Sequence, residues 1–170
     1  MDQSDELIEI VNNDNKVVGL GKRGYVHDLN LMHRSVHIVL LNKNNEIFLQ
    51  QRAWHKDSEP GKWDTSAAGH VSLGESTLVA AKRECNEELG LRTPSLELIF
   101  SMSASARTGY EFIDIFLCRS DVTPAPDPIE IIASQWCSSE DLCLWIKKES
   151  EIFTTVLENI FIWLRGHNVL

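Results

Sequence analysis

Three glutamates between positions 84 and 88, preceded by an arginine, are spaced so that the carboxylates could bind a metal ion. Arg83, Glu84, Glu87 and Glu88 belong to a stretch rich in alanine, leucine, lysine and glutamate, a mixture typical of an α-helix. With 3.6 residues per turn, the three glutamates share one face of such a helix. These like charges repel each other, and a hard divalent cation such as Mg²⁺, which prefers oxygen ligands, would compensate them. The alternative is a solvated acidic helix without a metal.

The chemistry that this cluster favours is hydrolysis of a phosphate anhydride. Breaking a diphosphate linkage requires delivery of water to a phosphorus atom surrounded by negative oxygens. Charge neutralisation and positioning therefore matter more than a strong nucleophile, and a divalent cation held by carboxylates can provide both.

Residues 69–91 read GHVSLGESTLVAAKRECNEELGL, with glycine, five residues, glutamate, seven residues and then R-E-x-x-E-E-x-G-L. This pattern resembles the Nudix box of the Nudix hydrolases. One position differs, because Cys85 stands where an aliphatic residue is usual, and cysteine is small and apolar enough to pack in a core. The resemblance implies a structural ion pair between Arg83 and Glu75.

The resemblance also implies roles for the residues that could act in catalysis. Glu87 and Glu88 are expected to bind Mg²⁺ or Mn²⁺, and Glu84 either binds the metal as well or acts as the base that activates water. Gly69 is expected to present its backbone carbonyl to the metal.

Segments outside the box are similar to isopentenyl-diphosphate isomerase and to the Nudix hydrolases most like it. These segments are MHRSV (32–36), LQQRAWHKDSEPGKWD (49–64), AAGHVSLGES (67–76) and ASQWCSSEDL (133–142). The isomerase has a catalytic cysteine where this chain has Ala68, which offers neither a proton nor a nucleophile. The isomerase box is also degenerate, whereas this chain keeps all three glutamates. Both differences favour a hydrolase acting on a small organic diphosphate, such as a nucleoside or prenyl diphosphate. The alternatives are an isomerase-like enzyme and a non-catalytic diphosphate-binding module.

A second metal site is suggested by residues at or near the isomerase's metal ligands, which are three histidines and two glutamates. The matching residues are His27, His33, His70 and Glu111. Gly109 takes the place of the remaining glutamate. Imidazole suits several transition metals, so these residues could hold an ion. The alternative is that the histidines are hydrogen-bonded core residues, since a missing ligand weakens a metal site.

Glu111 has a second possible role as an extra carboxylate ligand for the metal of the box, and Asp114 is the other candidate for it. Alternation along a strand places these two residues on opposite faces, so at most one of them can reach the metal directly.

Three cations are candidates for holding the diphosphate. Arg52 and Lys56 match isomerase residues that do so, and Arg23 is a third candidate. Arginine would bind phosphate oxygens through its fork of N–H groups and lysine as a point charge. The alternative is that all three are ordinary solvated cations. Three tryptophans could form a flat apolar wall for a base or a prenyl group: Trp54, Trp63 and Trp136. The alternative is that they are core residues, which is the commoner role of a tryptophan.

Composition limits the class of protein and its partners. The chain has 170 residues, 43% of them hydrophobic and 24% charged, which fits one ordinary globular domain over residues 1–170. A net charge of −9 and a pI near 5.1 leave no overall basic surface for a nucleic-acid polymer. The four cysteines form no metal-ligand spacing and are expected to be reduced. No leader pattern and no run of 18 apolar residues is present, so we expect a cytoplasmic protein without a membrane partner. The oligomeric state is not determined by these features.

Strand and helix patterns alternate irregularly along the chain. Strands predicted at 7–11 and 16–23 form an N-terminal hairpin over about 5–24. Strands predicted at 33–41 and 46–52 form a second hairpin. Further extended segments are predicted at 63–71, 96–102 and 110–119, and a last short strand ends at 136. Helices are predicted at 75–89 and in a C-terminal segment over about 138–166. This order favours an α/β (α+β) architecture with a mixed sheet rather than a doubly wound parallel one. It agrees with the Nudix fold, a mixed sheet sandwiched between helices, that the resemblance implies.

Overall fold

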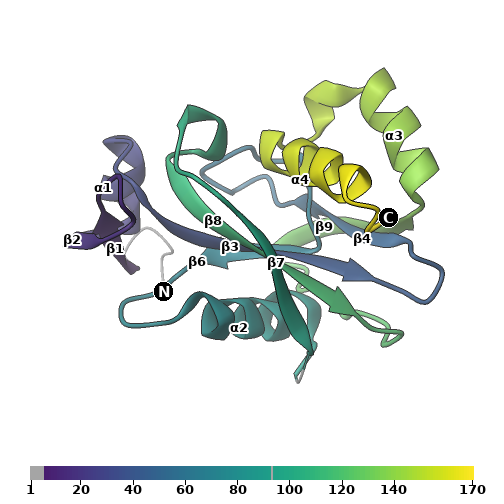
Figure 1. Ribbon diagram of the computed structural model, residues 1–170, viewed down its shortest axis with the longest axis horizontal. Helices are drawn as coiled ribbons and strands as arrows, with labels where there is room; N and C mark the ends of the chain where they lie inside the picture. Colours follow the sequence, from purple (N-terminus) through teal and green to yellow (C-terminus); the bar gives the residue numbers. More distant parts are fainter. Residues whose placement is uncertain (1–5, 93) are drawn as a thin grey trace.

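A mixed β-sheet with helices on both faces forms the body of the protein (Figure 1). The computed structural model describes residues 6–92 and 94–170. The sheet contains β3 (His33–Leu41), β4 (Ile47–Arg52), β5 (Trp63–Asp64), β6 (Ala67–His70), β7 (Leu96–Met102), β8 (Glu111–Arg119) and β9 (Ile131–Cys137). Five strands follow the order β5-β4-β3-β8-β7, while β6 pairs with β3 and β9 pairs with β4. The pair β3–β8 is parallel and the other pairs are antiparallel, which confirms the predicted mixed sheet.

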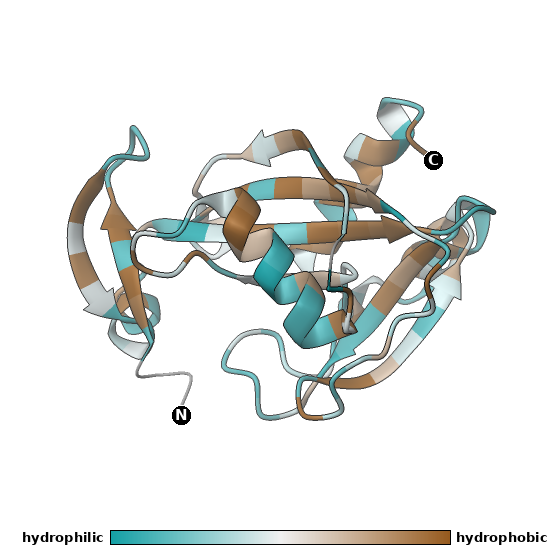
Figure 2. Cartoon of the chain, turned by 90° about the horizontal axis from the view of Figure 1, so that it is seen from below, coloured by the Kyte–Doolittle hydropathy of each residue, from teal (hydrophilic) through white to brown (hydrophobic). Residues whose placement is uncertain are grey.

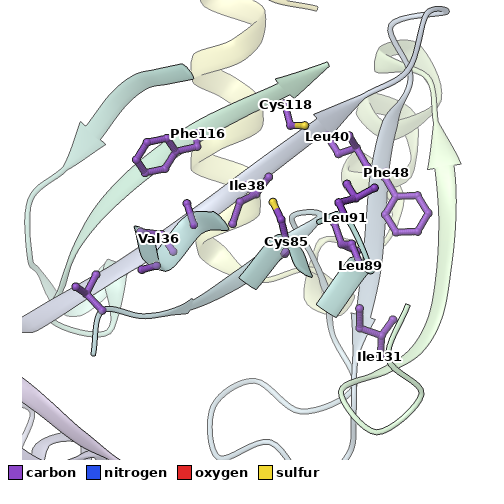
Figure 3. Packing of buried hydrophobic residues seen from close by; sticks show 14 residues of the cluster. Val36, Ile38, Leu40, Phe48, Cys85, Leu89, Leu91, Phe116, Cys118 and Ile131 are labelled. Carbon is purple, nitrogen blue, oxygen red and sulfur yellow. The ribbon is translucent and has the colours of Figure 1, made fainter. Parts of the chain in front are cut away.

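Helix α2 (Thr77–Leu89) covers one face of the sheet, and α3 (Ser139–Lys148) and α4 (Thr155–Gly166) cover the other (Figure 1). Alternation along β3 supplies both cores, because successive side chains point to opposite faces. Val36, Ile38 and Leu40 pack with residues of α2 (Figure 3), whereas Val39 and Leu41 pack with the two C-terminal helices. Figure 2 views α2 from outside, lying across largely hydrophobic strands with hydrophilic residues along the helix.

The ends of α2 are fixed by local side-chain and backbone chemistry. The Ser76 hydroxyl accepts a hydrogen bond from the Val79 amide at 3.3 Å, and Gly90 ends the helix in the left-handed region with φ of 68°. The helix therefore begins two residues after Glu75, the predicted start, and Glu75 lies in the preceding turn. Cys85 is fully buried against the sheet, which confirms that it packs as a core residue.

The N-terminal hairpin consists of β1 (Leu7–Val11) and β2 (Val17–Lys22), which pair antiparallel as predicted. Its expected start near residue 5 lies outside the described residues. The second strand was predicted to run through Arg23, but Arg23 begins a six-residue helix, α1 (Arg23–Asp28). A helix this short has too few residues for a helical period to appear in the sequence.

The second predicted hairpin is wrong over most of its length. β3 and β4 pair only through Leu41 and Ile47, next to their connecting turn. Beyond that point the two strands separate, because β3 pairs with β6 over 35–38 and β4 pairs with β9. The segment 63–71, predicted as one extended stretch, divides between them: β5 pairs with β4 and β6 pairs with β3. This separation opens the sheet at the end where polar residues gather.

The C-terminal segment 138–166 is interrupted rather than continuous. α3 ends at Lys148, a 3₁₀ turn follows at Ser150–Ile152, and α4 begins at Thr155. Thr154 explains the break, because its amide donates to the Trp63 carbonyl at 2.9 Å and its hydroxyl caps α4 by accepting from Leu157 N at 3.1 Å. Among the described residues, no helix has the length and apolar character needed to cross a bilayer.

Candidate active site

A cleft of about 750 Å³ lies where the sheet opens, and it is lined by residues of β3, β4, β6, α2 and the N-terminus of α4. Eleven of the candidate site residues line it: Arg23, His27, Arg52, Lys56, Gly69, His70, Arg83, Glu84, Glu87, Glu88 and Glu111. His33 and Glu75 do not line the cleft but contact residues that do. The tertiary structure thus brings together side chains that are up to 88 positions apart in the sequence (Arg23 to Glu111).

Two of the three box glutamates are buried at one wall of the cleft. Glu84 and Glu88 are 8% and 5% exposed, whereas the side chain of Glu87 is 54% exposed. Oε2 of Glu88 accepts hydrogen bonds from the Ala68 amide and from Gln50 Nε2, both at 3.1 Å. The Glu84 carboxylate lies directly against Gly69, and a Cβ at that position would collide with it. The backbone at residue 69 and the Glu84 carboxylate therefore approach so closely that only glycine fits there.

Arg83 joins the box helix to the turn before it. Its Nε and Nη2 donate to the Glu75 carboxylate at 3.1 and 3.0 Å, and Nη2 also donates to the His70 carbonyl at 2.9 Å. Its Nη1 contacts Glu84 and lies 3.1 Å from Oε2 of Glu87. The Arg83 guanidinium thus links the turn that contains Glu75, helix α2 and strand β6.

The electrostatics of the carboxylates fit a divalent cation bound by oxygen ligands. Burial, followed by the charge of Glu88, raises the pKa of Glu84 to about 8. Burial also raises the pKa of Glu88 to about 6, although Lys56 and the hydrogen bonds from Ala68 and Gln50 oppose that rise. Carboxylates that are this costly to ionise together are stabilised by a nearby cation, and their oxygen donors match Mg²⁺ or Mn²⁺.

The three candidate cations lie inside the cleft rather than on open surface. Arg52 donates to the Ser58 carbonyl through Nε and Nη2 at 3.1 and 2.9 Å, and its Nη1 donates to Asp64 Oδ2 at 3.2 Å. Lys56 forms an ion pair with Glu130, and burial lowers the pKa of its ammonium. The Arg23 side chain is 8% exposed, and its Nη2 lies 3.6 Å from Asp57.

Four residues with metal-binding side chains form a second group at the cleft, and three of them line it. His27, His33, His70 and Glu111 each offer a ligand atom, and these atoms all lie within 4.8 Å of one another. Nε2 of His27 and Nε2 of His70 are 3.0 Å apart, and Nε2 of His33 is 3.4 Å from Oε1 of Glu111. His33 Nδ1 donates to the Leu31 carbonyl at 2.9 Å, so Nε2 is the ring nitrogen that faces the Glu111 carboxylate.

These side chains could share one cation, because their ligand atoms face one another. Burial lowers the pKa of His27 to about 4, with His70 and His33 adding to the effect, and burial also lowers the pKa of His70. Both imidazoles are consequently neutral near pH 7, the form that binds metal. The donor set of three imidazoles and one carboxylate fits a transition-metal ion.

Strand alternation separates Glu111 from Asp114 as predicted. Glu111 lines the cleft, whereas Asp114 accepts a hydrogen bond from the Ser101 hydroxyl at 2.6 Å on the neighbouring strand and does not line it.

The suggested tryptophan wall is wrong, because none of the three tryptophans lines the cleft. Trp63 packs on Trp145, Trp136 packs on Phe48, and Trp54 is 71% exposed.

The cleft residues that sequence reasoning missed include Ser35, His37 and Asp64. A signal was present on β3, where polar residues occupy alternate positions at 33, 35 and 37 before Val39 and Leu41 continue the same face as apolar core. A strand face that changes from polar to apolar marks the edge of a core.

The mixed sheet with helices on both faces, and the carboxylate-bearing helix α2 packed on one of them, have the architecture of the Nudix fold, and comparison with known proteins agrees. The NUDIX domain family matches residues 31–157, and the chain belongs to the Nudix family.

Individual relatives carry both names suggested by the sequence. A Nudix hydrolase of Yersinia pestis is 38% identical over 167 residues, covering 96% of this chain and 88% of its own length. An isopentenyl-diphosphate Δ-isomerase of Serratia proteamaculans is 31% identical over 155 residues, covering 88% of this chain and 86% of its own length. The crystal structure of DR0079 from Deinococcus radiodurans superimposes with a TM-score of 0.80 at 28% identity, covering 92% of this chain and 97% of that one.

Proposed function

We propose that this protein is a Mg²⁺- or Mn²⁺-dependent Nudix hydrolase that cleaves the diphosphate linkage of a small organic molecule. The observation that carries the proposal is the meeting of Glu84, Glu87 and Glu88 with Gly69 in one cleft that also contains Arg52 and Lys56. A bound divalent ion would neutralise the diphosphate and lower the pKa of water.

The residues of the chain would divide the remaining work. Glu87, Glu88 and the Gly69 carbonyl hold the ion, and Glu111 is a further candidate ligand. Glu84 either joins them or takes the proton from the attacking water, which a carboxylate at the cleft wall can do. Arg52, Lys56 and Arg23 bind the phosphate oxygens, and the ion pair of Arg83 with Glu75 holds α2 in place.

Phosphate release from a panel of nucleoside and prenyl diphosphates, with and without Mg²⁺, tests the proposal. We expect turnover that requires the metal, and we expect Glu87→Gln and Glu88→Gln to lower kcat/KM by about 100-fold or more. Glu97→Gln, an exposed glutamate on β7, is the matched control and should retain wild-type activity. No turnover of any diphosphate, or full activity in both box variants, contradicts the proposal.

The histidine cluster favours an isomerase-like activity as the second candidate. His27, His33, His70 and Glu111 form a compact ligand set. Ala68, however, cannot supply the proton or nucleophile of a cysteine. Incorporation of deuterium into isopentenyl diphosphate in heavy water would support isomerisation, and its absence together with phosphate release supports the hydrolase. Calorimetric binding of a diphosphate without any product would instead indicate a non-catalytic module.

A further inference from the structure

Strand β9 forms an open edge of the sheet. Its residues 133–137 pair antiparallel with residues 47–51 of β4 in a regular register, and the one irregularity lies where Gln51 is followed by Arg52. On its other side, β9 pairs with no strand of the described chain. Residues 132–135 are exposed, as expected for a strand that has a neighbour on one side only.

The hydrogen bonds of β4 show which backbone groups of β9 point outward. The Arg52 amide donates to the Lys62 carbonyl at 2.9 Å, on the β5 side of β4. Backbone groups of an antiparallel strand alternate between its two neighbours, so Leu49, three residues away, bonds to its partner Gln135 on β9. Two residues of β9 consequently direct their amides and carbonyls away from β4: Ser134 and Trp136. Within residues 6–92 and 94–170, no backbone hydrogen bond is made on that side.

An open edge of this kind is a template for another strand. Proteins usually protect such an edge with a charge, a proline or a bulge. The edge strand β7 is protected in this way, because it carries the exposed Glu97 and a register shift between Leu98 and Phe100. No charge, proline or register shift interrupts residues 133–137 of β9. The β9 edge is therefore suited to strand pairing with another chain.

The segment 133–137 is complementary to itself about a two-fold axis at Gln135. In an antiparallel pair of two copies, Ser134 of each copy would lie opposite Trp136 of the other, and each outward amide would meet an outward carbonyl. The Gln135 side chain has both donors and an acceptor, so it can hydrogen-bond to the same side chain of a second copy. This symmetry favours a second copy as the partner, because a two-fold contact uses the same surface on both chains.

Charge also favours β9 as the place where two copies meet. The net charge of −9 makes two chains repel each other at long range, so a stable contact needs a surface without like charges. Residues 131–137 contain no charged side chain. The same symmetric pairing of β2 about Gly19 would instead place Lys16 opposite Lys22 of the second copy, which is destabilising.

We infer that β9 is a homodimer interface, at which two copies join their sheets by antiparallel pairing about Gln135. The result is one continuous sheet across the dimer. Ile132, which is 42% exposed next to the paired segment, would lie beside the second copy and lose apolar surface to it. This inference does not depend on the proposed hydrolase function.

Sedimentation equilibrium of the full chain tests the interface. We expect a mass that rises with concentration toward twice 19.3 kDa. Gln135→Glu keeps the size of the side chain but places two carboxylates at the axis, so the dimer Kd should rise about tenfold or more. Asn44→Asp is the matched control, because it adds the same charge at an exposed turn and should keep the wild-type Kd. Circular dichroism should show that both variants fold, since both positions are exposed.

Gln135→Cys tests the register of the pair. Residues opposite each other at a non-hydrogen-bonded position have Cα atoms about 4.5 Å apart, which is within the disulfide range of about 4.4–6.8 Å. Mild oxidation should therefore convert Gln135→Cys into a covalent dimer on a non-reducing gel. Glu97→Cys, at an exposed position on β7, is the control and should behave like the wild type, which has four cysteines of its own.

Three results would overturn the inference. A wild type that stays monomeric at every concentration leaves the β9 edge to a different partner. An equal dimer Kd in the wild type and Gln135→Glu places the contact on another surface. Equal cross-linking of Gln135→Cys and Glu97→Cys refutes the pairing about Gln135.

Discussion

The Asp64 carboxylate lies 3.2 Å from Nη1 of Arg52 and also accepts a hydrogen bond from the Thr154 hydroxyl at 2.9 Å. Asp64 is 2% exposed, so a single buried carboxylate joins a candidate diphosphate-binding arginine to the residue that caps α4. The position of the guanidinium in the cleft therefore depends on the docking of the C-terminal helix.

Asp64→Asn should weaken substrate binding more than turnover. The amide keeps the shape of the carboxylate but removes the charge that orients Arg52, so we expect KM for a diphosphate to rise about tenfold with a smaller change in kcat. The free energy of unfolding should fall by about 2 kcal/mol, because hydrogen bonds to a buried charge are lost. Steady-state kinetics and urea unfolding measure the two effects. Asp28→Asn, at an exposed position on α1, is the control, and an unchanged KM in Asp64→Asn contradicts the positioning role.

Gly69→Ala should disturb the box through a steric clash. The added Cβ would collide with the Glu84 carboxylate, so either the carboxylate or β6 must move. We expect a loss of about 1–3 kcal/mol of stability together with weaker Mg²⁺ binding, measured by thermal unfolding and calorimetry. Gly166→Ala is the matched control because nothing lies within 4 Å of the added Cβ, and it should be neutral or slightly stabilising. Wild-type metal affinity in Gly69→Ala would refute the close approach.

The metal-free protein should lose stability as pH rises through the neutral range. Glu84 has a pKa of about 8 in the folded protein against an ordinary value of 4.5, so between these values the folded state holds a proton that the unfolded state has released. Folding therefore becomes less favourable from about pH 4.5 to about pH 8, and the loss is complete above that range. Melting curves from about pH 5.5 to 8.5 should show the wild type falling relative to Glu84→Gln, and Mg²⁺ should reduce the difference. Parallel pH profiles for the two proteins would rule out the raised pKa.

The histidine cluster should bind a transition-metal ion independently of the box. Co²⁺ added to the protein should give a visible absorption spectrum, and His33→Gln should weaken Co²⁺ binding by about 10- to 100-fold, because Nε2 of His33 faces the other ligand atoms. His55→Gln, at an exposed loop position, is the control. If His33→Gln and His55→Gln bind Co²⁺ alike, the histidines are structural.

Local pattern was sufficient for the elements whose structure depends on nearby residues. The box helix, the N-terminal hairpin, the buried role of Cys85 and the opposite faces of Glu111 and Asp114 all follow from helical or strand periodicity and from capping. The extent of the β3–β4 hairpin could not be predicted, because β6 and β9 replace the sequence-adjacent partner and strand pairing depends on the whole sheet.

The sequence by itself determined the acidic helix and its spacing, and so the kind of chemistry and the family, because both are properties of consecutive residues. Only the tertiary structure decided that Ser35, His37 and Asp64 line the same cleft as Glu84 and that the tryptophans do not. Burial and contact depend on which distant segments pack together, and it is this packing that leaves the Ser35 hydroxyl buried at the cleft.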